Sequence, residues 1–285
     1  MNRPTCALLS AMTSVATVIV SHNSGLVLGT CLQAVAEQSL QSLSTVVVDA
    51  GSSSSVYLDR LQEAYGFRLE KQANLGFSRA NNLGYALCPV EAELILFLNP
   101  DAFMAATTLE QAVGLMAAQP EVGCLTARLL GYDIEQGRPT GLLDSTGIFR
   151  SWYGRWYDRG QGREDRGQFD RAEEVPAACG AFMLCRRTAL DQVALDGGAV
   201  FDPDFFLYKE DIELSLRLRK QGWKIGYAPE LQVYHGRGWQ RRRSRMSLAL
   251  RRIAAKNEIL LYRKHPSCYI LWALVKYLGV RGLGL

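Results

Sequence analysis

Acidic and amide side chains follow two short apolar runs of this sequence, where they could bind a charged ligand. Asp49 ends one run, and a turn of Gly51 and four serines follows it. Its carboxylate could accept the imide N–H of a pyrimidine ring, or it could cap the next helix. Asn99-Pro100-Asp101 follows the most apolar run of the chain. A carboxylate beside an amide suits Mg²⁺ or Mn²⁺ bridging a diphosphate, and a turn without a metal is the alternative.

Two carboxylates and an imidazole in the second half of the chain could act on such a ligand. Glu210 and Asp211 stand together at the predicted start of a helix. They could simply interact favourably with the helix dipole, or one of them could be a general base that deprotonates an acceptor hydroxyl. His235 follows the predicted short strand 232–234. A lone histidine is more often structural, but one at a strand end could complete a metal shell.

These side chains come together only if the apolar runs are neighbouring strands. Runs typical of strands buried on both faces lie at 17–21, 45–49, 94–98 and 122–127. Apolar residues at helical spacing lie between or after them, at 28–35, 56–65, 78–87 and 108–118. This alternation predicts an α/β fold with a Rossmann-like, mainly parallel central sheet flanked by helices. Ligands of such sheets bind beyond the carboxyl ends of the strands, which here carry Ser21, Asn23, Asp49, Gly51, Asn99 and Asp101.

The second half has a weaker pattern. Between 130 and 174, Gly, Asp and Arg surround isolated aromatic residues, which predicts a long functional loop. Further strands are predicted at 177–186, 224–228 and 232–234, with helices from 188 and at 210–221. We expect three parts in the chain, namely a leader at 1–16, one domain at 17–236 and a C-terminal helical extension at 237–285.

Composition excludes several classes of protein. A chain of 285 residues with 48% hydrophobic and 21% charged residues is typical of a folded globular protein. No glycine-rich dinucleotide or P-loop motif follows the first apolar run, which argues against a nicotinamide-dependent dehydrogenase and a P-loop enzyme. The seven cysteines are odd in number and contain no C-x-x-C pair, which favours a reducing cytosol.

The C-terminal part is basic. The net charge is +4, yet residues 236–264 contain ten Lys or Arg and one acid. Such a segment favours membrane headgroups or nucleic acid as a partner, and nucleic acid is disfavoured because aromatic platforms are not interleaved. The apolar run 268–275 is too short to span a bilayer. It could lie at a membrane interface through Trp272, Leu274 and Leu278, or pack on the domain or on a second subunit of a homodimer.

Eight motifs in register resemble those of family 2 glycosyltransferases with a GT-A fold, and especially their bacterial rhamnosyltransferase-like branch. They extend from about residue 17 to 265 and read VIVSHNSG, VVVDAGSS, NLGFSRANNLG, LFLNPDA, GAFMLCRR, FDPDFFLYKEDIELSLRLRKQGWKI, YAPELQVYH and KNEILLYRKH. The chain departs from the family pattern at Asn99, which replaces the first Asp of D-x-D, and at Ala50, where Asn is frequent. The Q-x-x-R-W motif of processive members is missing, which favours addition of a single sugar.

The resemblance implies a role for each candidate residue. Asp49 would bind the nucleotide base, and Asp211, beside Glu210, would be the catalytic base. Asp101, Asn99 and His235 would hold a divalent cation, Mg²⁺ or Mn²⁺. Other nucleotide-sugar contacts would come from Ser21, Asn23, Gly51, Asn74, Gly76, Asn81 and Asn82. The acceptor and sugar pocket would be bordered by Gly180, Ala181, Phe182 and Trp223.

The resemblance also implies an activity. An inverting, metal-dependent glycosyltransferase would move one hexose, with rhamnose the first choice, from a dTDP- or UDP-linked donor to a lipid-linked or polysaccharide acceptor in cell-surface glycan synthesis. Residues 17–128 would form the nucleotide-sugar half and 129–236 the acceptor half. A cytoplasmic enzyme, peripheral at the inner face of the membrane, fits this role. The alternative, prompted by Asn99 and Ala50, is a nucleotide-sugar-binding protein of the same fold without turnover.

Overall fold

A computed structural model describes residues 13–237 and 246–283 of the chain. The strands are β1 (Val15–Ser21), β2 (Ser44–Ala50), β3 (Arg68–Gln72), β4 (Leu94–Leu98), β5 (Ala102–Met104), β6 (Val122–Asp133), β7 (Arg138–Ser145), β8 (Ile148–Arg150), β9 (Trp156–Asp158), β10 (Glu173–Glu174), β11 (Phe182–Arg186) and β12 (Lys224–His235). The helices are α1 (Leu28–Ala36), α2 (Val56–Tyr65), α3 (Phe77–Ala86), α4 (Thr108–Ala118), α5 (Arg187–Val193), α6 (Glu210–Lys220), α7 (Leu248–Lys264) and α8 (Ile270–Leu283). Most of the predicted leader, 1–12, and part of the basic segment, 238–245, lie outside the described residues.

One large sheet runs through the molecule, in the order β10-β12-β6-β11-β4-β1-β2-β3. The strands β4, β1, β2 and β3 are parallel, β11 is antiparallel between β4 and β6, and β12 is parallel to β6. The predicted α/β fold with a mainly parallel central sheet flanked by helices is therefore confirmed.

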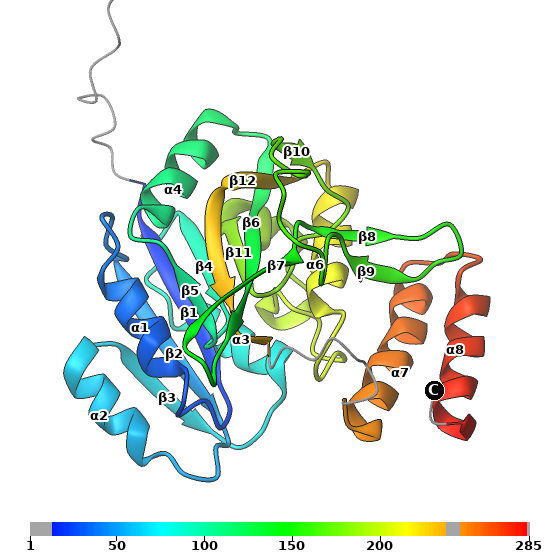
Figure 1. Ribbon diagram of the computed structural model, residues 1–285, viewed down its shortest axis with the longest axis horizontal. Helices are drawn as coiled ribbons and strands as arrows, with labels where there is room; N and C mark the ends of the chain where they lie inside the picture. Colours follow the sequence, from blue (N-terminus) through cyan, green and yellow to red (C-terminus); the bar gives the residue numbers. More distant parts are fainter. Residues whose placement is uncertain (1–12, 238–245, 284–285) are drawn as a thin grey trace, which may run out of the picture.

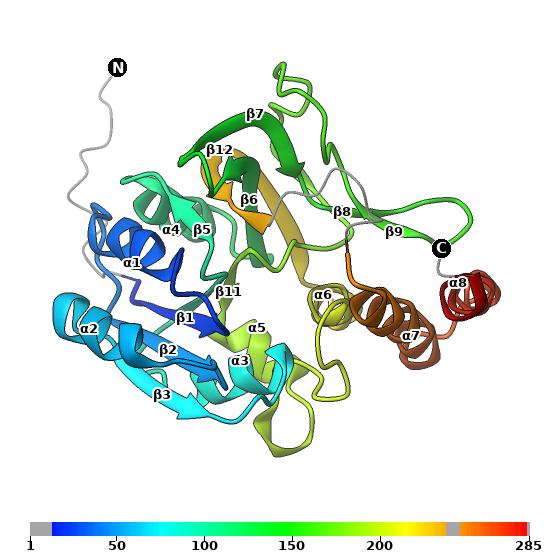
Figure 2. The ribbon, with the colours of Figure 1, turned by 60° about the horizontal axis from the view of Figure 1, so that its bottom comes forward.

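Helices cover both faces of this sheet (Figures 1 and 2). In β1, Val15 and Ile19 join a core that includes residues of α1, α2 and α4, whereas Val18 and Val20 join a second core with α3, α5 and α6. Since successive side chains of a strand point to opposite faces, an all-apolar strand is required between two helical layers. The parallel register brings the carboxyl ends of β1, β2 and β4 together at one edge of the sheet.

The segment predicted as a long loop contains regular structure. β6 continues to Asp133, β7 pairs with it antiparallel, and β8 and β9 form a hairpin of their own. The prediction was wrong because these strands are short or partly exposed, so their apolar pattern is weak. The predicted strand 177–186 starts only at Phe182, because the chain before it bonds to Ile148 and Asn99 instead. β1 begins inside the predicted leader, and β3 and β5 were not predicted.

A helical hairpin of α7 and α8 lies at the side of the sheet domain, within the segment expected to be a C-terminal extension (Figure 1). Its inner contacts reach α6 and the β8–β9 hairpin. Lys264 forms ion pairs with Asp202 and Asp204, at 2.6 and 2.7 Å, and the Tyr262 hydroxyl donates to the Gly154 carbonyl. Within the described parts of the chain, no helix has both the length and the apolar character that a bilayer span requires.

Candidate active site

The carboxyl ends of β1 and β2 lie side by side. Ser21 is paired with Asp49 in the parallel register, and its hydroxyl is 3.0 Å from that of Tyr57. The buried Asp49 carboxylate accepts hydrogen bonds from the backbone N–H of Ser52, at 3.2 Å, and from the Ser52 hydroxyl. Asp49 thus holds the turn after β2, and a nucleotide base would meet only its remaining lone pairs.

Asn23 ties this turn to the end of β1. Its backbone is left-handed, with φ 53°, and its Oδ1 accepts from both the N–H and the hydroxyl of Ser53, at 2.9 Å each. A shallow surface depression opens here, lined in part by Asn23, Ser53 and Tyr57. None of the acidic residues described below lines it.

Two glycines allow the segment after β3 to pack closely against its neighbours, namely the turn after β2 and the segment before α6. A Cβ on Gly51, at φ 73°, would lie 2.7 Å from the Asn74 nitrogen. A Cβ on Gly76, at φ 80°, would lie 2.6 Å from the Phe206 carbonyl oxygen, which accepts a hydrogen bond from the next residue of the segment. Any other residue would be strained at both positions and would separate these backbones. Asn74 Oδ1 accepts from the Gly76 N–H at 3.1 Å.

The structure gives Asn81 and Asn82 structural hydrogen bonds in place of the predicted nucleotide contacts. The Asn82 amide donates to the Phe201 carbonyl at 2.7 Å and accepts from the Phe201 N–H at 2.8 Å. Asn81 is 2% exposed and donates to the Phe77 carbonyl one turn earlier, at 3.0 Å. Both asparagines are oriented by the protein itself, which a pattern read along the chain does not reveal.

Asp101 and His235 meet at the edge of the sheet. β5 pairs antiparallel with the end of β12, with Ala102 opposite His235, and the Gly236 N–H donates to the Asp101 carbonyl at 2.8 Å. His235 Nε2 is 3.3 Å from Asp101 Oδ1 and 3.3 Å from the side-chain nitrogen of Asn99. The three residues predicted to hold a cation are therefore neighbours.

A buried carboxylate that the sequence did not single out orients the imidazole. Asp144 on β7 is 0% exposed and lies 2.8 Å from His235 Nδ1. Burial disfavours the charged imidazole, but Asp101 and Asp144 outweigh it and raise the pKa of His235 to about 9. Burial also opposes ionisation of Asp101, yet His235 holds the pKa of Asp101 below its ordinary value.

These residues fit a divalent cation shared with a ligand. In the neutral imidazole whose Nδ1–H donates to Asp144, Nε2 of His235 presents its lone pair beside Asp101, which is the usual arrangement of a metal-binding histidine. Asn99 Oδ1 is buried and has no hydrogen-bond partner among the described residues, so an acceptor is available there. Within residues 13–237 and 246–283, no three His, Cys, Asp or Glu side chains form a metal shell by themselves. A cation would need further oxygen ligands, such as those of a diphosphate.

Arg237 connects this pair to the predicted catalytic base. Its guanidinium is 2.8 Å from Asp158 Oδ2 and 3.6 Å from Asp144 Oδ1, and its side chain is 37% exposed. Burial is the main cause of the raised pKa of Asp211. The negative charge of Asp158, at the end of β9, raises that pKa further. The acidic groups that precede β5, lie on β7 and β9 and begin α6 thus form one continuous cluster.

Glu210 and Asp211 begin α6, where Glu210 is buried and Asp211 is partly buried. The Gly180 N–H donates to Asp211 Oδ2 at 3.1 Å, and the Ile212 N–H donates to Oδ1 at 2.8 Å. Burial, and next the charge of Asp211, raise the pKa of Glu210 to about 8, and its Oε2 has no hydrogen-bond partner in the described part of the chain. Two backbone N–H donors thus orient the Asp211 carboxylate, whereas Glu210 lies in an environment that favours its neutral form.

The start of α6 is fixed by strained backbone and by α7. Tyr208 and Lys209 both adopt left-handed conformations, with φ 73° and 78°, which is uncommon for residues other than glycine. The buried amide of Asn257 on α7 donates to the carbonyls of Leu207 and Tyr208, at 2.9 and 3.0 Å. Backbone strain of this kind persists only where surrounding contacts maintain it, and Asn257 provides two of them.

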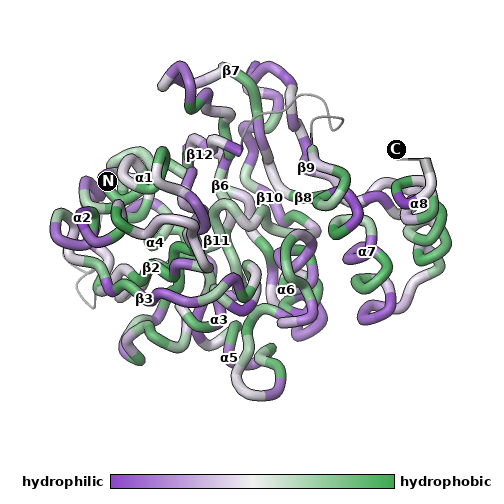
Figure 3. The backbone as a smooth tube through the Cα atoms, turned by 90° about the horizontal axis from the view of Figure 1, so that it is seen from below, coloured by the Kyte–Doolittle hydropathy of each residue, from purple (hydrophilic) through white to green (hydrophobic). Residues whose placement is uncertain are grey.

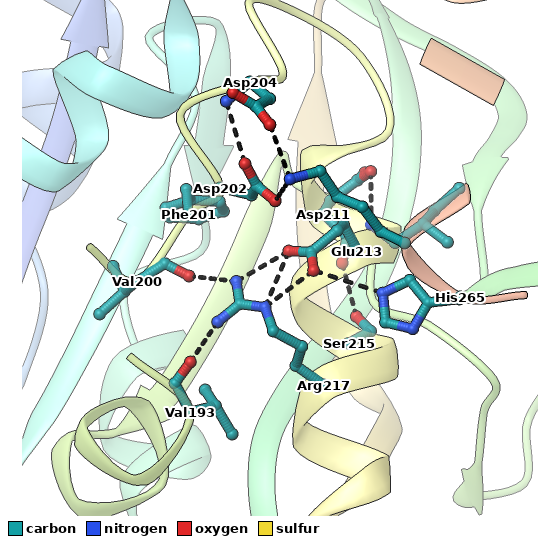
Figure 4. A network of polar contacts seen from close by, with 12 residues as sticks. Val193, Val200, Phe201, Asp202, Asp204, Asp211, Glu213, Ser215, Arg217 and His265 are labelled. Carbon is teal, nitrogen blue, oxygen red and sulfur yellow. Dashed lines mark hydrogen bonds and ion pairs between the residues drawn. The ribbon is translucent and has the colours of Figure 1, made fainter. Parts of the chain in front are cut away.

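A second network holds the body of α6 (Figure 4). Arg217 donates to Glu213 and to the carbonyls of Val193 and Val200, and His265 lies 3.3 Å from Glu213. The Ser215 hydroxyl donates to the Asp211 carbonyl at 2.7 Å. α6 is therefore anchored to α5, to the segment between α5 and α6, and to the end of α7.

The residues predicted for the acceptor pocket do not form one group. Gly180 contacts Asp211, and the Ala181 carbonyl accepts from the Asn99 N–H at 3.1 Å, so both lie at the cluster. Phe182 is fully buried in the core. Trp223 precedes β12, at the end opposite His235, and its indole N–H donates to Gln192 at 2.8 Å. Its place at the far edge of the sheet corrects the prediction that it borders the pocket.

Comparisons with known proteins agree with this architecture. The family model described as "Glycosyltransferase like family 2" matches residues 13–255. N-acetylglucosaminyl-diphospho-decaprenol L-rhamnosyltransferase of Mycobacterium tuberculosis is 45% identical over 56 residues, which is 20% of this chain. The match spans only 17% of that relative's length.

Solved structures share the fold at low sequence identity. GalNAc-T7 with UDP, GalNAc and Mn²⁺ has a TM-score of 0.67 at 16% identity, over 89% of this chain and 48% of that one. The mannosyltransferase PcManGT from Pyrobaculum calidifontis, in complex with GDP-Man and Mn²⁺, has a TM-score of 0.60 at 18% identity, over 95% and 74%. S. aureus TarS 1–349 in complex with UDP has 0.55 at 16% identity, over 93% and 72%. The match of the family model over most of the sequence, together with this shared architecture, shows that the chain belongs to glycosyltransferase-like family 2, a family of enzymes, and has the GT-A fold.

Proposed function

We propose that this chain transfers a single hexose from a nucleoside diphosphate sugar to an acceptor hydroxyl, with inversion at the anomeric carbon. The observation that supports this most strongly is the continuous cluster at the sheet edge. It begins with Asp101 and His235, passes through Arg237 and Asp158, and ends at Asp211. We infer that a pair suited to a cation and a partly buried carboxylate suited to a base share one site.

Asp211 would act as the general base. Burial makes its carboxylate more basic than that of an exposed aspartate, and the two backbone N–H donors fix its orientation. It would accept the proton of the acceptor hydroxyl while that oxygen attacks the anomeric carbon and the bond to the diphosphate breaks. The partly exposed guanidinium of Arg237 would stabilise negative charge on the leaving diphosphate.

Asp101, His235 and Asn99 would hold Mg²⁺ or Mn²⁺. When bound, the cation supplies positive charge to the diphosphate. The Mn²⁺ in the structures of GalNAc-T7 and PcManGT supports a divalent cation here. On the other side of the site, Asp49, Ser21, Asn23, Gly51, Asn74 and Gly76 would surround the nucleotide.

The donor and acceptor are the finer part of the proposal. The 56-residue match to an L-rhamnosyltransferase favours rhamnose, carried by dTDP or UDP, and a lipid-linked or polysaccharide acceptor in cell-surface glycan synthesis. The unpaired thiols of the six described cysteines suit the cytoplasm, where such a donor is available. The basic C-terminal segment suits peripheral contact with the inner face of the membrane. Exposed apolar side chains on α8 could alternatively bind a second copy of the chain, so a homodimer is the other outcome to be measured.

A two-stage experiment tests the proposal. Thermal shift with a panel of nucleoside diphosphate sugars, with and without Mn²⁺, identifies the donor because a ligand of the folded state raises its apparent stability. Transfer from that donor to a polyprenyl diphosphate-linked sugar is then measured with and without Mn²⁺. We expect Mn²⁺-dependent transfer. If a donor stabilises the chain but is neither transferred nor hydrolysed, the result would instead favour a nucleotide-sugar-binding protein without turnover.

A further inference from the structure

The outward face of α8 is apolar along its length. Leu271, Leu274, Val275 and Leu278 are 66%, 42%, 63% and 65% exposed, and their spacing places them on one stripe of the helix. Between positions 270 and 280, every exposed side chain belongs to this stripe. Figure 3 shows α8 at the outer edge of the molecule, coloured mainly as hydrophobic. Surface patches of this kind usually mark an interaction site.

A tryptophan at the tip of the β8–β9 hairpin adds to the stripe. Trp152 is 87% exposed. Its ring packs edge-on against Tyr153, with centroids 5.3 Å apart, and Tyr153 packs in the same way against Trp272 of α8, at 4.8 Å. Arg150 lies 4.5 Å above the ring of Tyr269. Two elements far apart in the sequence therefore lie side by side, and Figure 1 shows the end of the β8–β9 hairpin next to α8.

The basic residues around this apolar surface indicate which kind of partner it binds. Residues 246–283 contain seven Lys or Arg and one acid, Glu258. Glu258 is fully buried and paired with Lys276, so no acid of this hairpin is exposed. Arg252, Lys256 and Arg263 are exposed on α7. In a symmetric contact between two copies, the same basic surface would face itself and repel. Leucine, tryptophan and basic side chains together are typical of a surface that binds anionic lipid.

We propose that α8, the tip of the β8–β9 hairpin and the basic face of α7 form a docking surface for an anionic lipid bilayer. The stripe would enter the headgroup region, the arginines and lysines would contact the lipid phosphates, and the helix would lie along the membrane without crossing it. The opposite side of α7 holds the turn before Asp211 through Asn257. The bilayer would thus lie next to the acceptor side of the candidate site, which suits a lipid-linked acceptor.

Vesicle co-sedimentation tests this surface directly. The full chain is mixed with vesicles of phosphatidylglycerol and phosphatidylcholine, or of phosphatidylcholine alone, at low and high salt. We expect binding to the anionic vesicles that weakens with salt. The double variant Leu274→Ser/Leu278→Ser should lower the partition coefficient by at least about tenfold, because two leucines leave the lipid interface. Trp152→Ser should reduce it as well.

Val90→Ser is the matched control, since Val90 is 80% exposed in the loop before β4. It should bind vesicles as the unmodified chain does. Circular dichroism and thermal melting verify that all variants fold, which is expected because the changed side chains are exposed. Failure of the unmodified chain to bind anionic vesicles, or equal binding by the double variant, would overturn the proposal. So would a dimer in light scattering that the double variant abolishes while vesicle binding stays absent. The assay contains neither donor nor acceptor, so its result is independent of the transfer experiment.

Discussion

At the residue scale, Asp211 is the group on which the proposed chemistry depends. Asp211→Asn keeps the shape of the side chain but removes the base, and general base catalysis contributes about a hundred- to ten-thousand-fold. We therefore expect turnover to fall by at least about a hundredfold while the donor binds as before, measured by steady-state transfer and calorimetry. Asp196→Asn, at an exposed carboxylate, should leave both unchanged. An active Asp211→Asn variant would show that the base is another group.

Glu210 gives a pH signature in stability. Its pKa is about 8 in the folded chain against an ordinary 4.5, so the folded state binds more protons than the unfolded state between these values. Stability from this group is present below about pH 4.5 and is lost as pH rises toward 8, by on the order of a few kcal/mol. Glu210→Gln, which resembles the neutral acid, should flatten this decline in melting temperature.

Melting curves at pH 5, 6, 7 and 8 measure the effect, with Glu63→Gln as the control at an exposed glutamate. The control should decline with pH as the unmodified chain does. Parallel declines in the Glu210→Gln variant and the unmodified chain would mean that Glu210 is ionised in the folded state.

The sequence allowed some of these residues to be predicted and concealed others. Asp101, Asp211 and His235 end or begin elements, so their types and positions pointed to the site. Asp144 and Asp158 lie in strands with a weak apolar pattern, and nothing nearby in the chain indicates that His235 and Arg237 are their partners. The role of Asn82 was concealed for the same reason, because its partner is Phe201.

At the element scale, α7 acts on the site through Asn257. Asn257→Ala would leave the buried carbonyls of Leu207 and Tyr208 without their donor, which costs about 1–3 kcal/mol. Because the strained turn before Asp211 would relax, we expect kcat to fall about tenfold or more with the donor KM unchanged. Glu63→Ala, at an exposed residue of α2, is the control. Loss of stability without loss of kcat would reduce Asn257 to a purely structural residue.

The elements of the first half could be predicted because burial on two faces leaves a strong apolar pattern. β5 could not, since its three residues follow a Pro-Asp turn and owe their conformation to pairing with β12. That pairing is nevertheless what brings Asp101 to His235. β7 and β9 carry Asp144 and Asp158 and were hidden by partial exposure. The unpredicted elements are thus largely the ones that complete the site.

At the scale of the whole molecule, the α/β order and the helices on both faces followed from the alternation of apolar runs. The placement of the hairpin of α7 and α8 did not, because polar pairs between residues far apart in the sequence, such as Lys264 with Asp202, help to fix it. This hairpin links an exposed apolar surface on one side to the turn before Asp211 on the other.

Anomalous diffraction from crystals grown with Mn²⁺ and the best-binding nucleoside diphosphate tests most directly whether one site unites these groups. We expect an anomalous peak for a manganese ion coordinated by His235 Nε2 and the Asp101 carboxylate. The diphosphate should supply further oxygen ligands to this ion, and Asp211 should face the space beyond the phosphates. A manganese peak elsewhere, or a nucleotide bound away from both residues, would contradict the proposed glycosyl transfer site.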